Sequence, residues 1–154
     1  PDRWADEHVP IGRARRWLVR ASGGGPLHAP DAADLSILTF GNGLPMSLRV
    51  AGTLAGQGVS TAVLDLRWLS PLPVSDMLRE AAGSGQVLVV DETRRSGGVS
   101  EGIVTALVDG GFRGPIRRVT SADSFIPLGD AARAVLLDEA TVLAAAQALL
   151  AATE

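Results

Sequence analysis

The 154-residue chain contains no cysteine, no lysine and no tyrosine. The lack of cysteine excludes a disulfide framework, a thiolate nucleophile and a cysteine-ligated zinc site. The lack of lysine excludes a Schiff base and the lysine of a phosphate-binding P-loop, and the lack of tyrosine excludes a phenolic acid. All 14 basic side chains are therefore arginine. A cysteine-free chain suits a reducing compartment, and we expect a cytoplasmic location.

Strong charge and long apolar runs are also lacking. The net charge is only -3, which gives no electrostatic basis for binding nucleic acid or an anionic membrane. No uninterrupted apolar run reaches the roughly 20 residues of a membrane helix. The alanine-rich segment 140–152 is interrupted by Thr141 and Gln147. A hydrophobic content of 46% and only 9 prolines indicate a folded chain, and its length fits one compact domain.

Strand-like and helix-like segments alternate along the chain. The apolar patterns predict strands at 13–20, 35–40, 61–66, 86–91 and 115–120. Helical patterns cover about 45–57, 74–83, 100–109 and the residues from 139 onward. This alternation predicts an α/β fold, with a doubly wound, mainly parallel sheet of about five strands and helices on both faces.

The chain divides into a leading segment and a main domain. Residues 1–34 hold one strand and a loop at 21–34 that is rich in glycine, proline and alanine, which we expect to be flexible. Residues 35–154 form the α/β domain. Because the sequence opens on Pro1 rather than methionine, we expect one compact domain that is cut from a longer chain.

The stretch SILTFGNGLPM places a glycine turn between a strand and a helix. Gly41 and Gly43 match the first two glycines of G-x-G-x-x-G, and Asp65 follows about twenty residues later. Met46 occupies the third place, where glycine normally lets the helix approach the strand. We therefore expect a turn that binds no NAD and a helix held away from the strand. The free N–H groups at the helix start keep a nucleotide-binding module open as an alternative.

The string GVSEG around Ser100 matches the nucleophile elbow of hydrolases. That elbow needs its serine directly after a strand and a histidine later in the chain, but His8 and His28 both precede Ser100. The hydrolase interpretation fails, and an N-cap role for Ser100 explains it better.

Asp91 and Glu92 stand at the carboxyl end of the third strand of the 35–154 domain. That edge of an open α/β sheet is where ligands and partners usually bind. Paired carboxylates could perform acid–base chemistry or bind Mg²⁺. Arg94 and Arg95 follow directly, so an internal ion-pair network is an equal alternative.

Four stretches in order resemble one known family. They are VPIGRAR, DLSILTFGNG with VSTAVLDLRWLSPLP, VLVVDETRRSGGVSEGI, and RRVTSADSFIPLGDAA. Together they resemble the C-terminal domain of the transketolase superfamily. The nearest pattern is the β subunit, or β portion, of thiamine diphosphate-dependent 2-oxo acid dehydrogenases of the pyruvate or branched-chain type. The resemblance covers about residues 9–150, but this chain inserts residues 22–33 where the family has a short turn.

The resemblance implies a non-catalytic part of an oxidoreductase. In the family, thiamine diphosphate and Mg²⁺ are held by two preceding domains, so we expect no catalytic, cofactor-binding or metal-binding residue here and no activity of the isolated chain. The implied partners are those thiamine diphosphate-binding domains, on the same chain or an α subunit, and a second copy of this domain. In a multienzyme complex, the domain also helps to dock the lipoyl acyltransferase core.

The resemblance also points to residues at an interface or domain contact. The positions that match the family's most recognisable motifs are Asp65, Arg67, Asp91, Glu92, Gly97, Gly98 and Glu101. Trp68 and Phe125 lie in predicted loops and would suit aromatic contact anchors. Gly97 and Gly98 would permit close backbone approach or a positive φ. Internal scaffolding is an equal explanation for the whole set.

Two other functions stay open. One is the C-terminal domain of a transketolase or a deoxyxylulose-phosphate synthase, although the motif LDLRWLSPLP favours the dehydrogenases. The other is a free-standing nucleotide-binding regulatory module.

Overall fold

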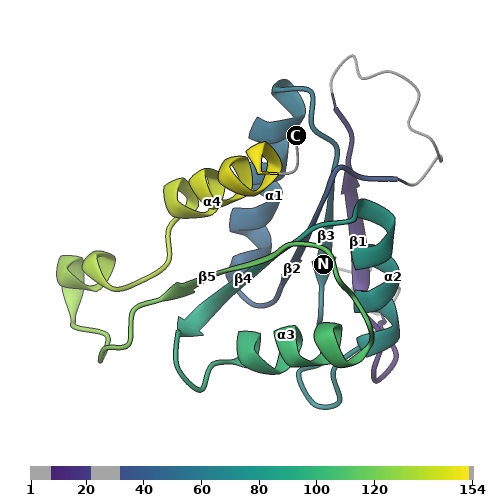
Figure 1. Ribbon diagram of the computed structural model, residues 1–154. Coiled ribbons are helices and arrows are strands. Elements are labelled where there is room, and N and C mark those ends of the chain that lie inside the picture. Colours follow the sequence, from purple (N-terminus) through teal and green to yellow (C-terminus); the bar gives the residue numbers. More distant parts are fainter. Residues whose placement is uncertain (1–7, 22–31, 153–154) are drawn as a thin grey trace.

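The computed structural model describes residues 8–21 and 32–152 and contains one five-stranded sheet (Figure 1). The strand order is β1-β3-β2-β4-β5, with β1 antiparallel to β3 and the other neighbours parallel. The strands are β1 Arg15–Val19, β2 Leu35–Thr39, β3 Thr61–Asp65, β4 Val87–Arg94 and β5 Ile116–Ser121. The predicted α/β fold with a mainly parallel sheet is confirmed. The loop predicted at 21–34 lies largely outside the described residues.

Four α-helices cover both faces of the sheet (Figure 1). They are α1 Gly43–Gly56, α2 Val74–Ser84, α3 Val99–Asp109 and α4 Glu139–Ala151. The first hydrophobic cluster joins α1 and α4 to one sheet face, and the second joins α2 and α3 to the other. Strands β2 and β3 are buried throughout because helices cover both of their faces.

The observed elements differ from the predicted ones mainly in the length of β4 and in the connection from β5 to α4. β4 continues to Arg94 with an irregular register between Asp91 and Arg94, so the Asp91–Glu92 pair lies within the strand rather than at its carboxyl end. A short 3₁₀ helix, η2 Gly129–Ala134, interrupts the connection from β5 to α4 and was not predicted.

The segment Gly129–Ala151 reaches the length and mean hydropathy of a membrane span, with a mean hydropathy of 1.6. Its backbone, however, forms η2, an irregular connection and the 13-residue α4. A single membrane-crossing helix needs about 20 residues, so neither piece alone is long enough. One face of α4 packs on the sheet through Val142, Ala146 and Leu149.

The amino-terminal strand β1 is anchored to helix α2 by ion pairs. The Arg13 guanidinium donates to both carboxylate oxygens of Asp76 at 2.9 and 3.1 Å, and the Ala14 N–H donates to the same carboxylate at 2.9 Å. Arg79 donates to Asp76 at 2.8 Å. A second pair joins Arg16 to Glu80 at 2.6 Å.

The Asp76 carboxyl shows how strong this anchor is. Burial alone would raise its pKa, but the hydrogen bonds from Arg13, Ala14 and Arg79 outweigh burial and lower the pKa to about 2. The ordinary value is 3.8, so the ionised form is stabilised in the folded state.

We predict that Asp76→Asn lowers the free energy of unfolding by about 2 kcal/mol at pH 7. Because the folded pKa is depressed, the contribution is complete above about pH 5 and is lost as the pH falls through 2. Urea unfolding from pH 7 to pH 2.5 should therefore show the gap between wild type and variant closing. Asp130→Asn, which removes an exposed pair with Arg133, is the control and should match wild type. A difference in free energy of unfolding that stayed constant with pH would contradict a stabilising role of the ionised Asp76 carboxylate.

Candidate functional site

The carboxyl ends of β2, β3, β4 and β5 meet at one edge of the sheet, because these four strands are parallel. The loops that follow Thr39, Asp65, Arg94 and Ser121 therefore gather there. We call these four loops the carboxyl edge. Every residue predicted for an interface lies on it, at the end of β3, in the last part of β4, or in the first turn of α3.

The turn from β2 to α1 is closed by a protein carboxylate. Gly41 has a φ of +56°, which suits glycine, and its missing side chain leaves room for the Glu92 carboxylate. The Asn42 N–H donates to Glu92 Oε1 at 3.1 Å. Glu92 thus occupies the positive end of α1, where a nucleotide pyrophosphate would otherwise bind.

The expectation that Met46 holds α1 away from the sheet is wrong. Met46 is only half-buried, whereas Gly43 and Ser47 are buried one turn apart on the inner side of the helix. A Cβ at Gly43 would collide with the Thr39 hydroxyl and contact Val90. The helix makes its close approach through these small residues, so the third glycine of the motif is not needed at position 46.

Asp91 is a fully buried carboxylate three residues before the end of β4. Its Oδ1 accepts hydrogen bonds from the Thr93 N–H at 2.8 Å and from the Thr93 hydroxyl at 2.7 Å. Its Oδ2 accepts the Ser100 N–H at 2.8 Å. These partners replace the predicted ion pairs with Arg94 and Arg95, so Asp91 holds the loop after β4 and the start of α3 together.

The N-cap prediction for Ser100 is also wrong. The residue at the cap of α3 is Gly98, and Ser100 lies buried inside the first turn. Gly98 packs against the Arg94 carbonyl, with the Asp91 carboxylate about 3.0 Å from where a Cβ would stand. Gly97 has a φ of +66°. Gly98 thus permits a close approach of the backbone, and Gly97 permits a positive φ, as the sequence predicted.

Asp65 belongs to a separate part of the carboxyl edge. Burial raises the pKa of its carboxyl, and the nearby charges of Arg67 and Arg15 only partly oppose this. Arg67 has a φ of +57° and donates to Asp65 through its N–H at 3.3 Å and its guanidinium at 3.4 Å. Strand β2 lies between Asp65 and Asp91, so the two carboxylates do not form one paired site.

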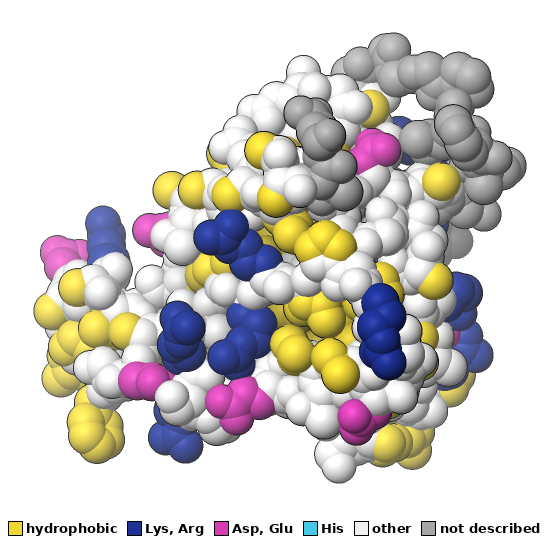
Figure 2. All heavy atoms as spheres, in the orientation of Figure 1, with side chains coloured by type: hydrophobic (Ala, Val, Ile, Leu, Met, Phe, Trp, Pro, Cys, Tyr) yellow, Lys and Arg dark blue, Asp and Glu magenta, His cyan; other side chains and the backbone are white. Residues whose placement is uncertain are grey.

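The two aromatic candidates have different surroundings. Trp68 is half-buried, and its Nε1–H donates to the Val9 carbonyl at 3.1 Å. Phe125 is 97% exposed, and Leu128 beside it is equally exposed. Ile126 lies between them and is 64% exposed. We call Phe125, Ile126 and Leu128 the apolar tip; Figure 1 shows the β5–α4 connection that carries it extending from the sheet, and apolar side chains gather there in Figure 2.

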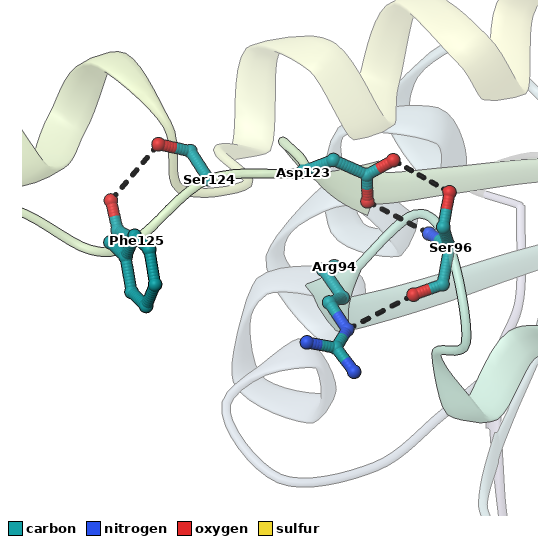
Figure 3. Close-up of a pocket in the computed structure, with 5 residues that line it drawn as sticks. All are labelled: Arg94, Ser96, Asp123, Ser124 and Phe125. Atoms are coloured by element: carbon teal, nitrogen blue, oxygen red, sulfur yellow. Dashed lines mark hydrogen bonds between the residues drawn. The ribbon is translucent and has the colours of Figure 1, made fainter.

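A direct bridge joins the loop after β4 to the loop after β5. Asp123 accepts the Ser96 N–H at 2.8 Å and the Ser96 hydroxyl at 2.6 Å, and these bonds lower the pKa of Asp123. Arg94 donates to the Ser96 carbonyl at 3.0 Å. Together with Ser124 and Phe125 these residues line an open recess of about 580 Å³. Figure 3 shows the Phe125 ring standing apart from the Asp123–Ser96 pair.

The residues of the carboxyl edge do not suit thiamine diphosphate or Mg²⁺. Across residues 8–21 and 32–152, no three His, Asp or Glu side chains lie close enough together to hold a metal ion. Asp91 already accepts N–H and O–H groups with both oxygens, and Glu92 occupies the start of α1.

The family assignment follows from comparison with known sequences and structures. The sequence pattern described as "Transketolase, C-terminal domain" matches residues 26–148. The chain belongs to the transketolase C-terminal domain family. Its fold agrees with a solved structure described as "Split gene transketolase, inactive beta4 tetramer", at a TM-score of 0.77 and 21% identity over 95% of this chain and 45% of that one.

Two curated relatives show which enzymes this transketolase C-terminal domain is similar to. The pyruvate dehydrogenase E1 component subunit beta of Bacillus subtilis is 30% identical over 123 residues, which is 78% of this chain and 38% of the relative. The 1-deoxy-D-xylulose-5-phosphate synthase of Streptomyces griseus is 36% identical over 110 residues, which is 70% of this chain and 17% of the relative. The domain therefore spans well under half the length of either relative.

Sequence reasoning missed several residues of the carboxyl edge in this transketolase C-terminal domain. Thr93, Ser96 and Asp123 form its internal hydrogen bonds, and Ile126 and Leu128 extend the apolar tip. The apolar FIPL run in a loop was a signal for the tip. The Ser96–Asp123 bridge spans 27 positions and leaves no local pattern.

We predict that Asp91→Ala lowers the free energy of unfolding by about 2–4 kcal/mol, because the Ser100 and Thr93 donors would lose a buried acceptor. Asp91→Asn keeps one acceptor oxygen and should cost less. Thermal unfolding, together with hydrogen exchange at the Ser100 amide, measures both effects. Asp109→Ala, at the exposed opposite end of α3, is the control and should leave that amide protected. Unchanged stability in Asp91→Ala would indicate a functional rather than a structural carboxylate.

We predict that Gly43→Val lowers the melting temperature, because its side chain would displace Thr39, which bonds the Val90 carbonyl at 2.9 Å. Gly52→Ala, in the same helix and with nothing near its added methyl, should hold or raise it. Neither wild type nor variant should bind NAD. NAD binding tighter than about 100 µM that Gly43→Val removed without lowering the melting temperature would instead make this turn a nucleotide site.

Proposed function

We propose that this chain is the C-terminal assembly domain of a thiamine diphosphate-dependent 2-oxo acid dehydrogenase, in its β portion. In this proposal, the carboxyl edge is the surface that contacts the enzyme's other domains or subunits. The likeness to a pyruvate dehydrogenase E1 beta subunit supports the assignment to this enzyme class. The enzyme would work in the cytoplasm, as the cysteine-free composition favours.

The observation that carries the proposal is how the edge carboxylates are used. Asp91 and Glu92 accept backbone N–H groups that fix two helix starts, and Asp123 fixes the adjoining loop. Such groups are positioned to hold loops in a defined shape rather than to exchange protons with a substrate. A rigid set of loops suits a contact surface.

The apolar tip supports the same interpretation. Phe125 and Leu128 are each 97% exposed, and Ile126 follows at 64%. Contiguous exposed apolar side chains with an aromatic member are typical of protein–protein contacts. We propose that the tip packs on the thiamine diphosphate-binding domains or on a second copy of this domain. The domain would also help to dock a lipoyl acyltransferase core.

The chemistry would belong to the assembled enzyme. There, thiamine diphosphate and Mg²⁺ on other domains would support decarboxylation of a 2-oxo acid and reductive acylation of a lipoyl group. This chain's residues would contribute only position and association. A second candidate is the C-terminal domain of a deoxyxylulose-phosphate synthase, which the 36% identity to the Streptomyces griseus enzyme favours.

We predict that the 154-residue chain folds but neither decarboxylates pyruvate nor binds thiamine diphosphate. Its edge carboxylates are already hydrogen-bonded within the domain. Calorimetric titration with thiamine diphosphate and Mg²⁺ should give only the heat of dilution. Saturable binding in the micromolar range would contradict the assembly role and assign the cofactor to this domain.

We predict that the chain self-associates at high concentration and that the double variant Phe125→Ser with Leu128→Ser weakens association at least tenfold. A buried aromatic anchor contributes about 2 kcal/mol or more to an interface, which supports this size of effect. Sedimentation equilibrium measures the dissociation constant. Val108→Ser removes an exposed apolar side chain on α3, away from the tip, and is the matched control. A strict monomer at millimolar concentration would count against this surface as a contact between copies.

A further inference from the structure

Strand β5 forms an open edge of the sheet, since it is last in the order β1-β3-β2-β4-β5. The Pro115 carbonyl accepts the Val87 N–H of β4 at 3.0 Å. Alternate residues of a strand bond to opposite neighbours, so Ile116, Arg118 and Thr120 turn their N–H and C=O groups away from β4. No residue in the described part of the chain bonds these outward N–H groups. Just past the strand, the Ala122 N–H donates to the Val135 carbonyl at 2.8 Å, so the edge is available to a further strand only along Ile116–Thr120.

Three arginines surround this edge. Arg95, Arg117 and Arg118 line a recess of about 420 Å³ together with Val104, Ile116 and Thr120. The Arg118 guanidinium donates to the Arg95 carbonyl at 3.4 Å and to the Ser100 hydroxyl at 3.3 Å. Within residues 8–21 and 32–152, none of the three forms an ion pair. Figure 2 shows basic side chains beside apolar ones on the face that carries β5 between α3 and α4.

We propose that β5 binds an extended acidic segment of a partner protein as an added strand. The outward backbone groups would pair with the segment, and its carboxylates would reach Arg95 and Arg118 on the α3 side of the edge. The proposal depends on the β5 edge alone and not on the reaction of the parent enzyme.

Charge complementarity selects this occupant over a second copy of the chain. A two-fold pairing of β5 with β5 would bring arginines of one copy against those of the other, and like charges on facing strands are destabilising. A small free anion could neutralise the arginines, but it would leave the row of outward backbone groups unpaired. An acidic strand satisfies both features.

The first test uses a synthetic ten-residue peptide of alternating glutamate and valine, with alternating lysine and valine as the control. Titration into the ¹⁵N-labelled chain at low salt should protect the amides of Ile116, Arg118 and Thr120 from hydrogen exchange. The affinity should fall as NaCl is added, because exposed charges are screened. Equal binding of the lysine peptide, or no binding of the glutamate peptide, would overturn the proposal.

The second test uses variants. The double variant Arg95→Gln with Arg118→Gln should weaken binding of the glutamate peptide roughly tenfold, since two ion pairs on one side of the edge are lost. Arg113→Gln changes an exposed arginine that bonds only carbonyls at the end of α3, and should leave the affinity unchanged. Thr120→Pro keeps the arginines but removes one outward N–H, and should abolish amide protection.

A melting curve shows whether Thr120→Pro folds. If it does not fold, the proposal is tested by comparing the peptide affinity of the double arginine variant with that of Arg113→Gln. Displacement of the peptide by inorganic phosphate, with no amide protection at any peptide concentration, would make the recess an anion site and contradict strand addition. Equal loss of affinity in Arg113→Gln would show a general charge effect and contradict it too.

Discussion

The carboxyl edge depends on one buried side chain, the Asp91 carboxylate in the last part of β4. A buried carboxylate is costly unless hydrogen-bond donors surround it, and here Thr93 and Ser100 supply them from the strand end and from α3. The bonds fix where β4 stops and where α3 starts. Ser121 extends the connection, because its hydroxyl donates to the Glu92 carbonyl and accepts the Leu137 N–H ahead of α4. These hydrogen bonds join the last part of β4 to the start of α3, to the end of β5 and to the segment before α4.

This arrangement is consistent with the assembly role proposed for the acidic pair Asp91 and Glu92. Consecutive strand residues point to opposite sides, so Asp91 turns inward to α3 while Glu92 reaches the start of α1. Each carboxylate complements the positive end of a different helix. Acid–base or metal chemistry would need those oxygens free. With three of the four oxygens engaged inside the domain, the edge presents shaped loops and an apolar tip, which suits the proposed contact surface.

The sequence predicted the fold well because β2, β3 and β4 are covered on both faces and therefore read as continuous apolar runs. It failed where long-range contacts replace local rules. Serine is a typical N-cap residue, which is why the sequence predicted that role for Ser100. In the structure, the Asp91 carboxylate, nine residues earlier, accepts the Ser100 N–H at the start of α3 instead. Met46 was judged by its place in a motif, whereas the helix approaches the sheet through Gly43 and Ser47. The Ser96–Asp123 bridge and η2 follow from tertiary packing, and no local pattern announces them.

The most direct test measures the hydrogen bonds of the edge carboxylates themselves. Scalar couplings across hydrogen bonds, recorded by NMR on a ¹³C,¹⁵N-labelled chain, link an amide nitrogen to the carboxyl carbon that accepts its proton. The account predicts couplings from the amides of Thr93 and Ser100 to the side-chain carboxyl of Asp91, and from Asn42 to that of Glu92. Absence of all three couplings, with these amides exchanging freely, would show the carboxylates to be unengaged and would contradict the account.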